Sequence, residues 1–102
     1  MSYRVELSSG AAKEFRNAHR YLKEHAPDHA PRWLASMRRA VLSLSEMPQR
    51  CALAPESEQF ELELRQLIED SYRILFTIAG RTVRVLHIRH SARKPLRGSG
   101  DE

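Results

Sequence analysis

Residues 72–89 read YRILFTIAGRTVRVLHIR, and this stretch decides the fold that the sequence predicts. Its first half alternates, so one face of a strand receives the apolar side chains of Tyr72, Ile74, Phe76 and Ile78. Residues 79–81 then supply a short turn containing glycine, which hairpin turns favour. Residues 82–89 are β-branched and apolar on both sides at nearly every position, which is typical of a central strand. The stretch therefore predicts a β-hairpin whose second strand lies inside a sheet.

The N-terminal part of the chain predicts a strand followed by a helix. Residues 3–7 alternate between apolar and charged side chains, as a half-buried strand does. The strand ends at Ser8-Ser9-Gly10, where either serine can cap a helix. An apolar stripe at helical spacing follows and predicts a helix that ends at Ala26, before a proline.

A second helix and a third strand are predicted between this helix and the hairpin. Asp28 is expected to cap the second helix, with Pro31 in its first turn, where a missing N–H costs nothing. Residues 48–60 have no clear period and read as a surface loop. Residues 61–66 alternate again and predict a strand with Leu62 and Leu64 on one face.

The order of elements is therefore β-α-α-β-β-β, in a single domain of residues 1–97 with a flexible tail of residues 98–102. The helical hairpin must bury its apolar stripes on one face of a small, mostly antiparallel sheet, which gives a two-layer α+β fold. No further element is left to cover the other face of the sheet, so we expect that face to be solvated or to form a site.

Composition restricts the class of protein. The chain has 102 residues, of which 41% are hydrophobic and 29% charged, which suits one modest globular core. No apolar run is long enough to span a bilayer or to act as a secretory signal, and the lone Cys51 cannot form an internal disulfide. These features predict a cytoplasmic protein that does not associate with membranes.

Charge is distributed unevenly along the chain, whose net charge is +4. Residues 71–97 hold seven basic residues and no acid, whereas residues 56–70 hold six acids and one arginine. Arginine presents a rigid fork of donors that matches phosphate or carboxylate groups. We therefore expect the C-terminal hairpin to present a cationic surface, left bare by the helices, to a macromolecule.

Motifs for several kinds of chemistry are missing. The chain has no glycine-rich phosphate loop and no Cys/His cluster with zinc spacing. His87 and His90 lie three residues apart on a predicted strand, so their side chains point to opposite faces and are unsuited to share a metal. The sequence predicts neither a metal nor a cofactor.

Several features, in this order and spacing, carry a family resemblance: the opening at residues 3–8, the two predicted helices, the strand at Leu64-Arg65, residues 72–76 and the ending at residues 88–93. The chain resembles the RelE/ParE superfamily of toxins from type II toxin–antitoxin modules over roughly residues 3–95. The resemblance implies a growth-inhibiting toxin, of the kind associated with plasmid stabilisation, that is neutralised by an antitoxin encoded beside it. A homodimer and a toxin–antitoxin hetero-oligomer are both compatible with the sequence.

The resemblance leaves two mechanisms open. RelE-like members cut mRNA on the ribosome, and Arg73 matches the arginine that stabilises phosphate charge in them. In that case His90 would serve as acid or base, with help from Arg93 or Arg89. ParE-like members instead poison DNA gyrase without chemistry of their own.

The details favour the ParE-like mechanism. The lysines expected on the strand before Arg73 are absent, and no tyrosine follows Tyr72. The ending at Ile88, His90, Ala92 and Arg93 is similar to the ParE type. Target or antitoxin contacts are expected at Arg65, Arg73, Arg84, Arg89, His90 and Arg93. A decayed relative, or a simple nucleic-acid-binding module, is the third alternative.

Overall fold

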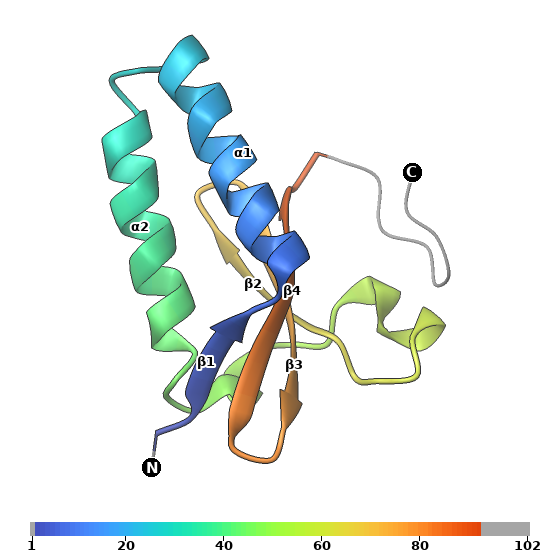
Figure 1. The fold of residues 1–102 in the computed structure, drawn as a ribbon. Helices are drawn as coiled ribbons and strands as arrows, with labels where there is room; N and C mark the ends of the chain where they lie inside the picture. Colours follow the sequence, from blue (N-terminus) through green and yellow to red (C-terminus); the bar gives the residue numbers. More distant parts are fainter. Residues whose placement is uncertain (1, 93–102) are drawn as a thin grey trace.

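The computed structural model describes residues 2–92, which form one sheet with two helices on one of its faces (Figure 1). The strands are β1 (Arg4–Leu7), β2 (Arg65–Glu69), β3 (Tyr72–Ala79) and β4 (Thr82–His90). The helices are α1 (Ser9–His25) and α2 (Ala30–Ser43), with short 3-10 helices η1 (Pro48–Arg50) and η2 (Pro55–Gln59) between α2 and β2. The predicted β-α-α-β-β-β order and two-layer α+β architecture are confirmed. No helix in this part of the chain is long and apolar enough to cross a membrane.

The strand order is β1-β4-β3-β2, so β4 is central, as its composition predicted. β3 pairs antiparallel with both β4 and β2. β1 pairs with β4 in parallel, with Arg4 opposite Thr82 and Leu7 opposite Val85. The sheet is therefore mixed rather than mostly antiparallel. Sequence alternation indicates which residues form strands, but it does not show the direction in which distant strands pair.

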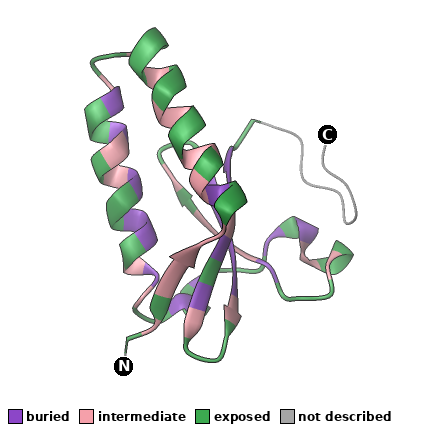
Figure 2. Ribbon diagram, in the orientation of Figure 1, coloured by how far each residue is buried: buried purple, intermediate pink, exposed green. Residues whose placement is uncertain are grey.

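The main core lies between the helices and the sheet. Ile74 and Phe76 of β3 and Val83 and Val85 of β4 are fully buried there, and purple positions mark this core in Figure 2. Trp33 of α2 is 1% exposed and meets the ring edges of Phe15 (5.4 Å between centroids) and Tyr72 (5.2 Å). These aromatic contacts join both helices to β3.

The two helices begin differently. Ser8 adopts an extended conformation and its Oγ accepts a hydrogen bond from the Ala11 N–H at 3.0 Å, which satisfies one of the free donors of α1. The expected cap of α2 at Asp28 is wrong, because His29 is the capping residue and its side chain accepts no hydrogen bond. Pro31 does lie in the first turn, as predicted.

The far face of the sheet is covered, contrary to the sequence prediction. Residues 54–64 lie over it and form a second apolar cluster, in which Ala54, Leu64 and Leu75 are buried and Phe60 and Leu86 pack against them. Residues 48–60 have no period and so did not predict this cover, because an irregular segment can bury isolated side chains without any repeat.

The third strand is displaced from the predicted range. It covers Arg65–Glu69 rather than residues 61–66, so Leu62 is exposed while Leu64 is buried. The backbone N–H of Leu64 donates to Ser57 Oγ at 2.9 Å, and its carbonyl accepts from the Ala54 N–H at 2.7 Å. These bonds tie Leu64 to Ala54 and Ser57 of the covering segment, so β2 begins one residue later, at Arg65.

Replacing Ser8 with alanine is expected to lower the free energy of unfolding by about 1 kcal/mol, because α1 loses its N-terminal cap. Urea denaturation followed by circular dichroism measures the loss. Ser9→Ala is the matched control, since Ser9 is exposed in the first turn of the same helix. Equal losses in the two variants would contradict the assigned role of Ser8.

Candidate functional site

Two arginines lie side by side on the far face of the sheet. Arg73 of β3 and Arg89 of β4 are directly opposite each other in the strand register. Both are buried, Arg73 at 8% exposure and Arg89 at 3%. Two like charges at facing positions destabilise a sheet unless other groups compensate them.

Glu56 of η2 supplies that compensation to Arg73. Its Oε2 and Oε1 accept hydrogen bonds from Arg73 Nη1 at 2.8 Å and Nη2 at 2.6 Å, which is a bidentate ion pair. Gln66 Oε1 on β2 accepts from Nε and Nη2 of the same guanidinium at 3.0 and 2.8 Å. Glu56 itself is only 1% exposed, so the pair is closed to solvent.

Because of these contacts, the surface of the hairpin differs from the cationic surface that the sequence predicted. Arg73 and Arg89 do not form the bare cationic surface that the charge distribution suggested. The acid-rich stretch before β2 folds back over the sheet and places a carboxylate on Arg73. Glu56 was not among the candidate residues, and the only signal for it was the acid-rich run next to an arginine-rich one.

The other expected site residues lie apart from this pair. Arg65 is half-buried at the start of β2 and donates to the Cys51 carbonyl at 2.6 Å, with Glu63 3.5 Å away. Arg84 projects from β4 with a side chain that is 55% exposed, 3.6 Å from Glu6. Arg93 lies outside the described residues.

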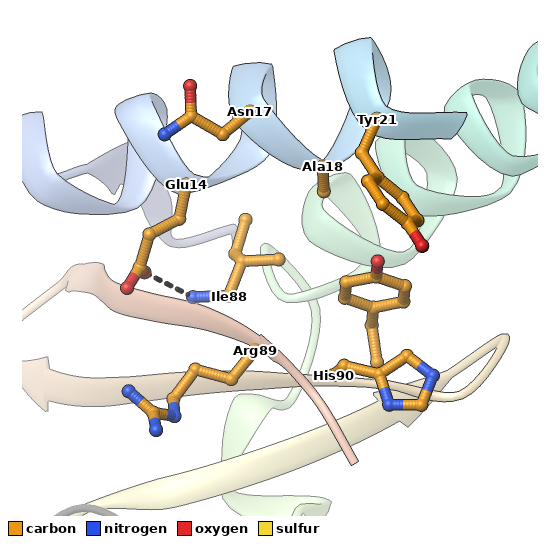
Figure 3. Close-up of a pocket in the computed structure, with 8 residues that line it drawn as sticks. Glu14, Asn17, Ala18, Tyr21, Ile88, Arg89 and His90 are labelled. Atoms are coloured by element: carbon orange, nitrogen blue, oxygen red, sulfur yellow. Dashed lines mark hydrogen bonds between the residues drawn. The ribbon is translucent and has the colours of Figure 1, made fainter. Parts of the chain in front are cut away.

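His90 borders a hollow between α1 and the end of β4 (Figure 3). The hollow measures about 360 Å³ and is lined by Glu14, Asn17, Ala18, Tyr21, Tyr72, Ile88, Arg89 and His90. The His90 ring meets the edge of Tyr72 at 5.2 Å between centroids. Its Nδ1 accepts the Ala92 N–H at 3.0 Å, which leaves Nε2 as the nitrogen that can face a partner.

Glu14 joins α1 to the edge of β4. Its Oε1 accepts the Ile88 N–H at 2.8 Å, drawn as the dashed line in Figure 3, and Oε2 lies 3.4 Å from His87 Nδ1. β1 ends at Leu7, opposite Val85, so this part of β4 lacks a neighbouring strand on that side. The carboxylate satisfies a backbone donor that β1 is too short to reach.

The register supports the prediction that His87 and His90 start from opposite faces. His87 is paired with Leu75 of the far face, and His90 with Tyr72 of the helix face. Among residues 2–92, no group of three or more His, Cys, Asp or Glu side chains is arranged to hold a metal ion.

An apolar hollow of about 380 Å³ lies between the two helices near the start of α1. Its lining consists of Leu7, Ala12, Phe15, Val41 and Leu42, with Arg16 and Arg38 among them. Leu42 is 67% exposed although it belongs to this apolar patch. An exposed apolar strip beside two arginines suits a partner with apolar anchors and acidic side chains.

Most of the chain matches a known protein family. Residues 5–95 match the family described as ParE toxin of type II toxin-antitoxin system, parDE. The chain belongs to the ParE toxin family. It is therefore a toxin of the type II toxin–antitoxin class within the RelE/ParE superfamily. A search of curated protein sequences finds no significant match.

Solved structures share the ParE fold at low sequence identity. The chromosomal ParDE system from P. aeruginosa is 14% identical, with a TM-score of 0.69 over 87% of this chain and 96% of that one. The RelBE2 toxin–antitoxin complex from Mycobacterium tuberculosis is 24% identical, with a TM-score of 0.64 over 91% and 95%. The archaeal RelE–RelB complex from Pyrococcus horikoshii OT3 is 17% identical, with a TM-score of 0.52 over 92% and 100%.

The Tyr72 phenol is expected to ionise at a higher pH than a free tyrosine. Burial raises its pKa, and Tyr21 and Asp70 raise it further. Because the folded state disfavours the phenolate, this group's stabilising contribution is complete below the usual tyrosine pKa and is lost as pH rises through the folded value. Absorbance titration near 295 nm measures the ionisation. Tyr72→Phe should remove the late-titrating phenol, whereas Tyr3→Phe should leave it; retention in Tyr72→Phe would contradict the assignment.

Proposed function

We propose that this ParE-family toxin arrests growth by binding DNA gyrase, and that it acts by contact rather than by cleaving RNA. In the proposal its cognate antitoxin, encoded beside it, neutralises it in the cytoplasm through a toxin–antitoxin hetero-oligomer, and the module stabilises the plasmid or locus that carries it.

The observation that carries this choice is the ion pair of Arg73. In-line cleavage of RNA needs a cation that is free to stabilise the charge developing on the phosphate. Both terminal nitrogens of Arg73 donate to Glu56, and its Nε donates to Gln66. The residue that a RelE-like reaction would need is therefore occupied and buried.

The remaining candidates also favour binding over chemistry. His90 Nδ1 already accepts a hydrogen bond, and the nearest described ring is the phenol of Tyr72, whose pKa is raised by burial. Lysines and a late tyrosine are absent from the positions where the nuclease pattern has them. In this proposal the exposed Arg84 and His90 contact the target, while Arg73 joins the sheet to its covering segment through Glu56.

The apolar hollow between α1 and α2 is the proposed binding site of the antitoxin. Its lining gives anchors for apolar side chains, and Arg16 and Arg38 attract acids in the same segment. The occupant in this proposal is an amphipathic, acidic antitoxin helix laid in the groove. A short protein with an acidic tail and a DNA-binding N-terminal part is expected in the neighbouring reading frame.

Expression without the antitoxin is expected to arrest growth, with gyrase-dependent DNA breaks and without cleavage of translated mRNA. Supercoiling and DNA-cleavage assays with purified gyrase measure the first effect, and primer extension on translated mRNA measures the second. Codon-phased mRNA breaks that disappear in a folded Arg73→Ala variant would overturn the choice of target. Normal growth would indicate a decayed relative.

Leu42→Asp is expected to weaken antitoxin binding at least tenfold, because burial of a leucine contributes about 1.5–3 kcal/mol and about 1.4 kcal/mol corresponds to a factor of ten. Leu62→Asp is the matched control, since Leu62 is 59% exposed and borders a separate hollow with Glu63 and Thr77. Titration calorimetry with the purified antitoxin measures both. Equal affinities for the two variants would place the antitoxin elsewhere.

A further inference from the structure

The turn that follows α2 places a methionine in a strained backbone conformation. Met47 lies between the end of α2 and η1, beside the start of β1 (Figure 1), with φ 47° and ψ 55°. A side chain disfavours this left-handed region, because its Cβ crowds the following carbonyl oxygen, and a following proline further restricts the residue before it. Among residues 2–92, the other positive φ angles belong to Asp70, Ser71 and Gly80, which are residue types that turns commonly accept.

The side chain of Met47 contributes nothing to the core. It is 71% exposed, more than any other large hydrophobic side chain in residues 2–92, and it belongs to neither apolar cluster. Exposed apolar residues are common, so the exposure alone would indicate nothing. Here, however, the same residue also carries backbone strain that a glycine would relieve. Neither the core nor the turn explains why a methionine occupies this position, and strain of this kind is characteristic of functional sites.

Arg50 holds the turn in place. Its Nη1 donates to the carbonyls of Glu46 at 2.6 Å and Met47 at 3.2 Å, and its Nη2 donates to Ser43 Oγ at 3.1 Å. Pro48, the next residue, is fully buried and fixes the chain on the other side of the turn. The backbone of Met47 is therefore held from both sides, and its Cβ points in a fixed direction. A contact that is arranged before binding loses little entropy when a partner arrives.

The surroundings of Met47 indicate what kind of partner fits. Glu46 and Gln49 are exposed and already hydrogen-bonded, to Ser2 Oγ at 2.9 Å and to the Tyr3 hydroxyl at 2.5 Å. The carboxylate of Glu46 would repel phosphate groups, and an aliphatic thioether has no charge with which to attract them. An apolar side chain flanked by polar ones instead resembles the anchor of a protein–protein interface. Methionine also adapts its shape to an irregular apolar pocket.

We propose that Met47 is an apolar anchor that inserts into a pocket on the protein target of this toxin. The turn of residues 46–50 presents the side chain, and Arg50 keeps the turn in shape. The inference rests on the proposed function, which makes DNA gyrase the target and places the antitoxin between α1 and α2. It adds an apolar contact to the polar contacts of Arg84 and His90 in that proposal.

Met47→Ala removes the anchor and keeps the strained backbone. The toxin concentration that halves the supercoiling activity of purified gyrase should rise at least tenfold, because the interface loses a buried apolar chain. Met47→Leu, which preserves apolar volume, should stay within about threefold of the wild type. Leu62→Ala is the matched control, since Leu62 is also an exposed apolar residue, at 59%, and should inhibit as the wild type does.

Met47→Gly tests the strain separately. Glycine adopts the left-handed region freely, so the unfolding equilibrium should shift about threefold toward the folded state relative to Met47→Ala, while inhibition stays lost. Urea denaturation followed by circular dichroism measures the shift and also shows that each variant is folded. A variant that is more stable and less active is the expected signature of a residue kept for binding. Equal stabilities of the glycine and alanine variants would remove the evidence of strain and overturn the proposal.

Growth arrest on expression without the antitoxin separates this inference from the choice of target. If the wild type arrests growth without inhibiting gyrase, the proposed target is wrong, but loss of arrest in Met47→Ala and not in Leu62→Ala would still support the anchor. Undiminished gyrase inhibition by Met47→Ala, or undiminished arrest at equal expression, would overturn the anchor. A tenfold loss of antitoxin affinity without loss of arrest would also overturn it, since Met47 would then contact the antitoxin. A wild type that does not arrest growth would overturn both proposals.

Discussion

Pairing of β4 with strands from both ends of the chain is the constraint on which the domain depends. β4 bonds to β1 on one side and to β3 on the other, so the first strand and the last hairpin close one sheet. The helices can bury Trp33 and Met37 only because this sheet offers a continuous apolar face, made of Ile74, Phe76, Val83 and Val85. The far face, in turn, receives alternate residues of the same strands, and there Arg73 and Arg89 lie side by side.

The termination of β1 at Leu7 has consequences beside α1. β4 continues past this point to His90, so its last residues form an edge against the helix. Glu14 and Ser8 supply the partners that a longer β1 would have provided, by accepting from Ile88 N–H and donating to the Leu86 carbonyl. The hollow lined by Tyr21, Tyr72 and His90 lies beside the part of β4 that no longer pairs with β1.

Regular periods in the sequence predicted most of the fold. Alternation in residues 72–89 gave the hairpin and its central strand, and helical stripes gave both helices. The covering segment could not be predicted, because Leu64 and Ala54 are buried by isolated contacts with no period. The ion pair of Arg73 could not be predicted for the same reason. The sequence shows Glu56 as one acid in an acid-rich run, but its position over β3 depends on the path of an irregular segment. The charge pattern therefore predicted that Arg73 and Arg89 are exposed, whereas both are buried.

The ion pair between Glu56 and Arg73 also restricts which substitutions these two positions can accept during evolution. Loss of either partner alone leaves a charge enclosed by the sheet and its cover, which costs about 3–5 kcal/mol, a large share of the stability of a small domain. Replacement of both by apolar residues of similar volume avoids that cost. Descendants of this sequence are therefore expected to keep both charges or to exchange them together.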